Sequence, residues 1–173
     1  MLTEAVIRRL APRARDDYVA AFVNGAATLE QWEFNTPARL TALLATISHE
    51  TGGLTIVREN TAWTNSNLAI FSAKTAAKIR PFVGNKVKEA NAAYGDRLGN
   101  ERNGTNDDDG WRFRGGGMIQ VTGRENFEKM GKLIGVPLGD KPELIEDANV
   151  SLKAACAESA QFHQYADRGE KGF

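Results

Sequence analysis

The sequence predicts a mainly α-helical fold, and three observations carry this prediction. Apolar residues recur at the helical spacing i, i+3, i+4 and i+7 in Leu40, Leu43, Leu44 and Ile47. A helix start precedes them, because Thr36 suits an N-cap and Pro37 suits the first helical position. Segments with strand character are short. With 173 residues, of which 42% are hydrophobic, the chain can form a single domain over 1–173 with one sizeable core.

The other elements follow from the same kinds of signal along the chain. We expect helices over residues 3–10, 16–23, 67–80 and 84–94, a helical turn from Pro142, and a last long helix that contains Leu152, Cys156 and Phe162. The Gly52-Gly53 pair ends the helix that starts at Pro37. A small β-hairpin near residues 53–65 is the most sheet that we expect, and residues 99–117 form a long irregular loop.

Residues 118–121 have the composition of a short strand. Alternate residues of a strand share a face, so Gln120 and Thr122 would present an amide and a hydroxyl together, which can hydrogen-bond a sugar or a water. Thr122 and Glu125 also have the spacing of a capping box, so a structural role for Thr122 is the alternative. The helix that follows has an apolar face made of Phe127, Met130, Leu133 and Ile134.

Charge and composition exclude several classes of protein. The 22 basic and 22 acidic side chains cancel, so no net charge attracts nucleic acid or an anionic membrane. No apolar stretch approaches the ~20 residues of a membrane span. The N-terminus lacks the pattern of a secretory signal. A single cysteine, Cys156, excludes an internal disulfide, and we expect a buried, unreactive thiol.

We expect neither a metal nor a cofactor. His49 and Glu50 begin like a zinc-protease motif, but Gly53 occupies the second histidine position. Residues 105–110 begin like a calcium loop, but the glutamate required at the twelfth position is absent. Residues 115–117 are not followed by the lysine and hydroxyl residue of a phosphate-binding loop.

Glu50 is the clearest candidate for chemistry. It lies three residues after Ile47 and continues the apolar face of its helix. Burial there would favour the protonated carboxyl, as a general acid near neutral pH requires. The alternative is a glutamate that faces solvent or pairs with an arginine.

Glu59 is the candidate partner of Glu50. The Gly52-Gly53 break lets the chain turn, so the two carboxylates can face each other across a groove. Two carboxylates in different environments are what a glycosidase needs, and a separation of about 6.5–9.5 Å leaves room for a water and inverts the anomeric centre. The alternative is an exposed Glu59 paired with Arg58 or Arg80.

Three aromatic residues, Trp63, Tyr94 and Trp111, lie in or beside predicted loops. Aromatic faces stack on sugar rings, but a small helical domain also needs such residues for its core, and both interpretations remain open.

Several motifs together resemble glycoside hydrolase family 19, the chitinase-like lysozymes, and most closely the phage endolysin branch. They are ISHETGG at 47–53, REN at 58–60, WRFRG at 111–115 and GMIQVTGREN at 117–126, and the resemblance covers roughly residues 35–165. It implies a two-lobed, lysozyme-like helical fold with a catalytic cleft. It also implies inverting hydrolysis of β-1,4 bonds next to N-acetylated sugars.

The resemblance assigns roles to residues of this chain. Glu50 matches the general acid, Glu59 the general base, and Thr122 the hydroxyl residue that helps hold the attacking water. The expected substrate-binding residues are Gln120, Asn126 and Trp63, to which we add Tyr94 and Arg114.

Two departures from the family pattern bear on activity. The family usually has Arg-Gly-Arg-Gly where this chain has Arg114-Gly115-Gly116-Gly117, so an arginine that commonly supports the site is missing. The family also continues past the last helix to an Ile-Asn-Gly-Gly segment, whereas this sequence ends at Phe173. We therefore expect either a truncated chain or a short member with a more open cleft.

These observations predict a bacteriolytic enzyme that cleaves the glycan of peptidoglycan. We expect a monomer, made in a bacterial cytoplasm without a signal peptide, which reaches the cell wall after the membrane is permeabilised. Its expected partners are peptidoglycan glycan strands or chitin oligomers, without nucleic-acid binding or membrane insertion. The alternatives are a chitinase of the same family, a lytic transglycosylase, and a non-catalytic glycan-binding virion module.

Overall fold

The computed structural model describes residues 2–104 and 107–168, and the chain divides into two compact units. Unit 1 comprises Met1–Val57, Gly117–Gln120 and Leu144–Phe173, and unit 2 comprises Arg58–Gly116 and Val121–Glu143. Each unit is therefore assembled from separate stretches of sequence. Both are built from helices, and the described residues form isolated β-bridges but no strand. The predicted helical class is confirmed.

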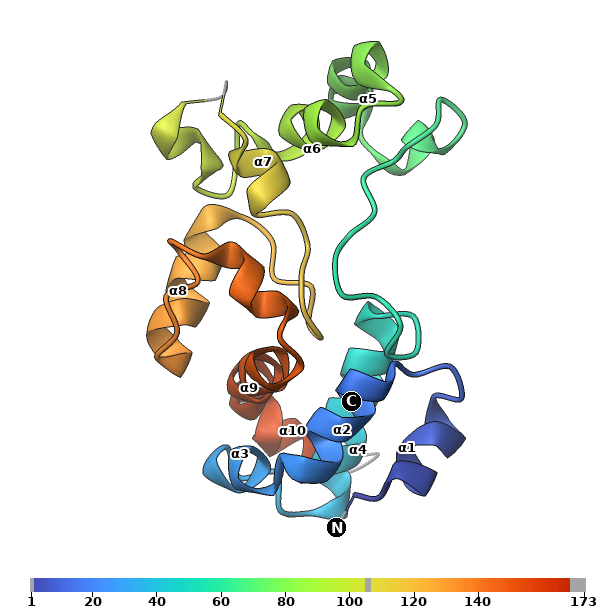
Figure 1. Ribbon diagram of the computed structural model, residues 1–173, viewed down its shortest axis with the longest axis vertical. Helices are drawn as coiled ribbons and strands as arrows, with labels where there is room; N and C mark the ends of the chain where they lie inside the picture. Colours follow the sequence, from blue (N-terminus) through green and yellow to red (C-terminus); the bar gives the residue numbers. More distant parts are fainter. Residues whose placement is uncertain (1, 105–106, 169–173) are drawn as a thin grey trace. The chain divides into compact units, whose positions relative to one another are not determined.

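Unit 1 is a bundle of helices from the two ends of the chain (Figure 1). Its α-helices are α1 (Glu4–Leu10), α2 (Asp16–Asn24), α3 (Ala26–Gln31), α4 (Pro37–Glu50), α9 (Ala148–Ser159) and α10 (His163–Ala166), with the 3-10 turn η5 (Ala160–Phe162) between the last two. Helix α9 packs against α2, α3 and α4. The core of unit 1 includes Tyr18, Phe22, Leu43, Ile47 and Leu152, all nearly or completely buried.

The start signals read from the sequence set the ends of several helices. Thr36 Oγ1 accepts a hydrogen bond from the Arg39 amide at 3.3 Å, and Pro37 occupies the first turn of α4, as predicted. Asp147 caps α9 through the amides of Asn149 and Val150. Helix α3 was not predicted, because it is short and buries a single apolar residue, Leu29.

Unit 2 contains shorter helices. They are η1 (Asn67–Ile70), α5 (Ala73–Ile79), η2 (Arg80–Phe82), α6 (Lys86–Tyr94), η3 (Asn100–Asn103), α7 (Asp109–Arg112) and α8 (Arg124–Ile134), and η4 (Pro142–Glu146) spans the boundary with unit 1. One apolar cluster gathers Trp63, Leu68, Ile79 and Tyr94. The ring of Phe127, on α8, packs edge to face against the ring of Phe113, with 5.3 Å between the ring centroids.

Three local predictions are wrong. No hairpin forms at residues 53–65, where residues 51–55 make a turn. Residues 117–120 also form a turn rather than a strand, and Gln120 adopts a positive φ of 51°. The capping box is absent, because Gly123 rather than Thr122 is the N-cap of α8 and no side chain caps it.

The long loop expected over residues 99–117 contains two helical turns, η3 and α7. Within it, Thr105 and Asn106, the first residues of the segment compared with a calcium loop, lie outside the described residues. Phe127, Met130 and Ile134 form the buried face of α8 as predicted, whereas Leu133 is exposed.

Cys156 and the helix lengths bear on two expectations drawn from composition. Burial raises the pKa of the Cys156 thiol to about 12, in agreement with the expected buried thiol. Across residues 2–104 and 107–168, every helix is too short or too polar to cross a bilayer.

Candidate active site

Glu50 is the last residue of α4 in unit 1. Its side chain is exposed, whereas Ile47 is completely buried, so the predicted burial of Glu50 is wrong. Three residues of an α-helix turn by about 300°, which directs Glu50 about 60° away from Ile47. The alternative interpretation, a helix-end glutamate that faces solvent, fits its surroundings better.

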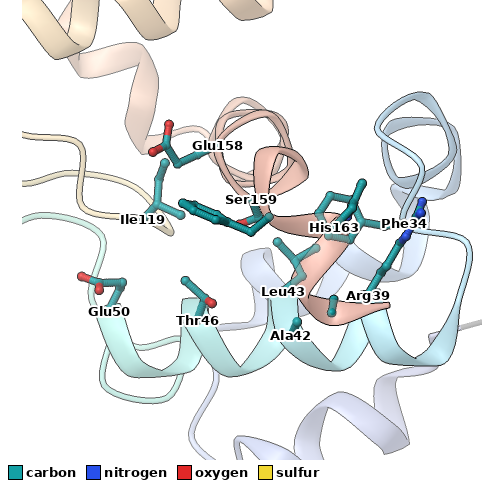
Figure 2. Close-up of a pocket in the computed structure, with 12 residues that line it drawn as sticks. Phe34, Arg39, Ala42, Leu43, Thr46, Glu50, Ile119, Glu158, Ser159 and His163 are labelled. Atoms are coloured by element: carbon teal, nitrogen blue, oxygen red, sulfur yellow. The ribbon is translucent and has the colours of Figure 1, made fainter. Parts of the chain in front are cut away.

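A pocket of about 320 Å³ in unit 1 begins at Glu50 (Figure 2). Helix α4 forms one side, with Glu50 and Thr46, and α9 forms the facing side, with Glu158 and Ser159, while Ile119 lies beside Glu158. The complete lining consists of Phe34, Arg39, Ala42, Leu43, Thr46, Glu50, Ile119, Glu158, Ser159, Phe162, His163 and Ala166. The sequence analysis did not single out Glu158, which no motif distinguishes from other exposed glutamates.

Glu59 lies in unit 2 and is half-buried. Its carboxylate is held at both oxygens: the Tyr94 hydroxyl donates to Oε1 at 2.7 Å, and the Gly115 amide donates to Oε2 at 3.3 Å. The Glu59 amide in turn donates to the Gly115 carbonyl at 2.8 Å. Both oxygens of the Glu59 carboxyl group therefore act as hydrogen-bond acceptors.

The donor to Glu59 is protonated at neutral pH. Burial, together with the adjacent Glu59 carboxylate, raises the pKa of the Tyr94 hydroxyl well above its ordinary value. The hydroxyl therefore keeps its proton and remains a donor. Tyr94 itself comes from the last position of α6.

Two arginines fix the backbone on either side of Glu59. Arg58 donates to the carbonyls of Arg114 and Pro142 at 2.9 and 3.2 Å. Arg114 donates to the carbonyls of Glu59 and Trp111 at 3.3 and 2.8 Å, and its guanidinium lies 3.5 Å from the centre of the Trp111 ring. In unit 2, Arg114 therefore supports the Glu59 loop.

A buried carboxylate that the sequence analysis missed supports the next segment. Glu89 on α6 is completely buried and accepts hydrogen bonds from the amides of Trp63 and Gly84 at 2.7 and 2.6 Å. It holds the Trp63 segment, four residues after Glu59, against α6. A glutamate inside a predicted amphipathic helix gives no sign in the sequence that it will be buried.

Two of the three predicted aromatic contacts, Trp63 and Tyr94, behave as core residues. Trp63 and Tyr94 are buried, with exposed fractions of 6% and 9%, and their rings pack at 6.4 Å. One face of the Trp111 ring is covered by Arg114. A ring that stacks on a sugar needs an open face, so these positions favour the core interpretation of Trp63 and Tyr94.

The remaining predicted residues fall in both units. Gln120 belongs to unit 1, where its side-chain amide donates to the Gly117 carbonyl at 2.8 Å. Thr122 and Asn126 belong to unit 2, where the Asn126 amide donates to the Thr122 carbonyl at 2.8 Å. The expected single strand face for Gln120 and Thr122 is wrong, because the chain turns at Gln120.

A metal centre finds no support in the part of the chain that the structure describes, where no three residues of the ligating types gather. His49 is exposed, and His163 Nε2 donates a hydrogen bond to the Trp32 carbonyl at 2.8 Å.

Comparison with known proteins gives a relative by sequence and solved structures of similar fold, one of which is described here. No protein-family model matches the chain. A glycosyl hydrolase family 19 domain-containing protein of Haemophilus influenzae is 27% identical over 162 residues, which cover 90% of this chain and 76% of that protein. The crystal structure of a chitinase C mutant superposes with a TM-score of 0.54 at 19% identity. That alignment covers 88% of this chain, which spans about half (52%) of the chitinase chain.

The two comparisons agree with the motifs. The sequence relative carries the family name that the motifs predicted, and the structural relative shows that the helical fold is that of a chitinase. Neither bears on the phage endolysin branch. The resemblance of this chain to glycoside hydrolase family 19 is thereby confirmed.

Proposed function

We propose that this chain is a glycoside hydrolase that cleaves the β-1,4 bonds of bacterial peptidoglycan by an inverting acid/base mechanism. The motifs around Glu50 and Glu59, the family 19 relative and the chitinase fold support a glycoside hydrolase. The observation that carries the proposal is the hydrogen bonding of Glu59, whose two carboxylate oxygens each face a donor.

In this mechanism each glutamate has one task. Glu50 donates a proton to the leaving glycosidic oxygen, and its exposed position gives it access to substrate. Glu59 takes a proton from a water that attacks the opposite face of the sugar, and Thr122 helps to orient that water. The mechanism requires the two carboxylates to stand about 6.5–9.5 Å apart during catalysis.

Chitin is the second candidate substrate, because the structural relative is a chitinase. Chitin and peptidoglycan share the β-1,4 linkage between N-acetylated sugars, so the same two carboxylates serve either substrate. Turnover of chitin oligomers compared with purified peptidoglycan separates the two.

We further propose an endolysin role, in which the protein is made in the bacterial cytoplasm and reaches the wall after the membrane is permeabilised. The zero net charge supports weak attraction to anionic cell surfaces. Added from outside, the protein should lyse Gram-negative cells only after their outer membrane is permeabilised. Rapid lysis of untreated cells would contradict this role.

The decisive experiment is product analysis on purified peptidoglycan with three variants. Glu50→Gln and Glu59→Gln should each lower the release of reducing ends by about 10³-fold, since each removes a proton-transfer group. Glu30→Gln, an exposed glutamate on α3, is the matched control and should leave the rate unchanged.

The products also distinguish the alternatives. Inversion gives the α-anomer as the first product, which proton NMR detects before mutarotation. Anhydro-sugar ends would instead identify a lytic transglycosylase. Binding to peptidoglycan without new reducing ends would identify a non-catalytic module, and unchanged hydrolysis by Glu50→Gln would overturn the assigned acid.

A further inference from the structure

The pocket that begins at Glu50, called here the Glu50 pocket, is larger than a bond-cleaving acid needs. It occupies about 320 Å³, at the lower end of the 300–1,000 Å³ typical of ligand sites. Its lining comes entirely from unit 1, on α4, α9, η5, α10 and two single residues, Phe34 and Ile119.

We propose that the Glu50 pocket binds the lactyl-peptide arm of a muramic acid residue, and that the protein therefore prefers peptidoglycan with peptide stems over chitin. This inference rests on the proposed function, because it takes Glu50 as the residue at the scissile bond. It adds the substrate group that the neighbouring pocket accepts.

The pocket lies directly beside the proposed acid. Glu50 is itself part of the pocket lining, so a sugar bound against its carboxylate has the pocket beside it (Figure 2). In muramic acid the arm is attached to carbon 3 of the ring, through an ether oxygen. A substituent at that carbon is the ring's main route out of the line of the glycan and into a side pocket.

The side chains that line the Glu50 pocket are chemically suited to the arm. Apolar side chains of different sizes line the pocket, among them Ala42, Leu43, Ile119 and Phe162. The hydroxyls of Thr46 and Ser159 add groups that can donate or accept hydrogen bonds. A lactyl-alanyl arm presents the complementary groups, namely two methyls, carbonyls and an amide N–H.

Glu158 gives the pocket an acceptor for that amide. It is exposed on α9 and lines the pocket beside Ile119 (Figure 2), with one oxygen, Oε1, accepting from the Gln161 side-chain amide at 3.0 Å and Oε2 left for a ligand. A carboxylate accepts hydrogen bonds only, so it suits the amide N–H of the arm.

The volume of the Glu50 pocket also matches the arm. A cavity of about 150 Å³ holds one benzene molecule of six carbons, so about 320 Å³ has room for roughly twice as many atoms. Lactyl and alanyl groups together have about ten non-hydrogen atoms, which matches this space. Chitin carries only a hydroxyl at carbon 3 and would leave the pocket filled with water.

The far end of the pocket limits how much of the stem enters. Arg39 lines that end, but its guanidinium donates to both Asp167 oxygens at 2.8 and 2.7 Å and to the Glu33 carbonyl at 2.8 Å. With three of its five N–H groups engaged and its charge already paired with Asp167, it offers little to the acidic residue that follows alanine in a peptide stem. The stem beyond the first residue therefore lies outside the pocket.

The inference is tested by placing a large side chain on α4 where it fills part of the Glu50 pocket. Thr46 and Thr41 are both exposed threonines of α4, and only Thr46 lines the pocket. The Thr46→Trp variant is therefore compared with Thr41→Trp as the matched control. Both are assayed on peptidoglycan with its stems and on the same glycan after an amidase has cut the lactyl–alanine bond, which leaves the lactyl group in place and removes the arm from alanine onward.

We expect Thr46→Trp to lower kcat/KM on stem-bearing peptidoglycan by about tenfold and to change the rate on stripped strands by less than about twofold. Thr41→Trp should match the native protein on both substrates. Equal losses on both substrates, or no loss on either, would overturn the inference. Ser159→Leu, on the facing wall, repeats the test if Thr46→Trp fails to fold.

A binding assay keeps this inference separate from the proposed function. The Glu50→Gln protein, with and without Thr46→Trp, is sedimented with the two glycans. If the double variant binds stem-bearing glycan more weakly than Glu50→Gln does, and binds the stripped glycan equally well, the result supports the arm pocket. This holds even if the native protein hydrolyses neither glycan. The absence of hydrolysis would defeat the proposed function only. Equal binding of both proteins to both glycans would defeat the arm pocket.

Discussion

The Tyr94 hydroxyl donates a 2.7 Å hydrogen bond to Oε1 of Glu59, and the two residues are 35 positions apart in the sequence. The contact joins the end of α6 to the loop that carries the proposed base. Tyr94 therefore acts on Glu59 as a positioning residue, a role different from the sugar stacking considered for it from the sequence.

Removing this hydroxyl should reduce catalysis more than stability. A hydrogen bond to a charged group contributes about 1.5–3 kcal/mol, so Tyr94→Phe should lower kcat by roughly 10- to 100-fold while the ring keeps its packing. Steady-state kinetics on peptidoglycan, with thermal unfolding alongside, measures both effects.

The control is Tyr165→Phe, which changes an exposed tyrosine on α10. It should leave kcat and the unfolding temperature unchanged. If Tyr94→Phe retains full kcat, the hydroxyl does not position the base.

The helices were predictable where the signals were local. Helix α4 has the bounds that Thr36, Pro37 and the Gly52-Gly53 pair indicate, since capping and periodicity act within one or two turns. The error over residues 118–121 has a local cause as well. Ile119 and Val121 favour a strand by composition. The positive φ angles of Gly117 and Gln120 turn the chain within this segment instead.

The candidate site was predictable only as a set of residues. The motifs identified Glu50 and Glu59, but no pattern in the sequence indicates that Glu59 meets Tyr94 and Gly115 or that Glu158 lines the Glu50 pocket. These contacts depend on how distant segments pack. The same limit explains why the burial of Glu89, which holds the Trp63 amide, was not foreseen.

The N-cap of α8 should not tolerate a side chain. Gly123 has a φ of 89°, and a Cβ there would lie 2.3 Å from Leu98 Cβ. Gly123→Ala should lower the free energy of unfolding by about 2–4 kcal/mol, from backbone strain and overpacking together. Chemical denaturation measures the loss.

Gly135 is the matched position for this test. It also has a positive φ, 71°, but a Cβ there meets nothing within 4 Å. Gly135→Ala should therefore cost only about 1–2 kcal/mol, the strain of the left-handed conformation. Equal losses at the two glycines would mean that the Leu98 contact relaxes freely.

The Asp109–Arg124 ion pair should stabilise unit 2 far more than its exposed counterparts. Arg124 donates to both Asp109 oxygens at 2.7 Å, and the aspartate is 1% exposed. Asp109→Ala leaves a largely buried guanidinium whose remaining carboxylate partner, Glu128, lies 4.0 Å away, and should cost about 3 kcal/mol of unfolding free energy.

The exposed pair between Arg15 and Asp17 provides the comparison, with hydrogen bonds of 3.0 and 2.8 Å. Asp17→Ala should cost about 1 kcal/mol or less, because water screens the pair. Urea titrations of both variants give the two values. A loss at Asp109 no larger than that at Asp17 would show that Arg124 finds another partner.

The Cys156 thiol should make stability fall at alkaline pH. Burial raises its pKa from 9.0 to about 12 in the folded protein, so between these values the unfolded chain has lost the thiol proton while the folded chain keeps it. The unfolded state then binds fewer protons, and stability decreases with rising pH by up to about 1.4 kcal/mol per unit. Below pH 9 this contribution is fully present.

Cys156→Ala isolates the contribution of the thiol to the pH dependence of stability, because the lysines and tyrosines titrate alike in the variant and in the native protein. At pH 7 the variant should be less stable than the native protein by about 1 kcal/mol, for the smaller side chain in a closely packed helix. As the pH rises from 9 to 10.5, the native protein should lose unfolding free energy faster than Cys156→Ala. The difference in unfolding free energy between the two proteins therefore narrows or reverses. Urea titrations at pH 7, 9 and 10.5 measure it, and a difference that stays constant across this range would mean that the thiol ionises equally in the folded and unfolded states.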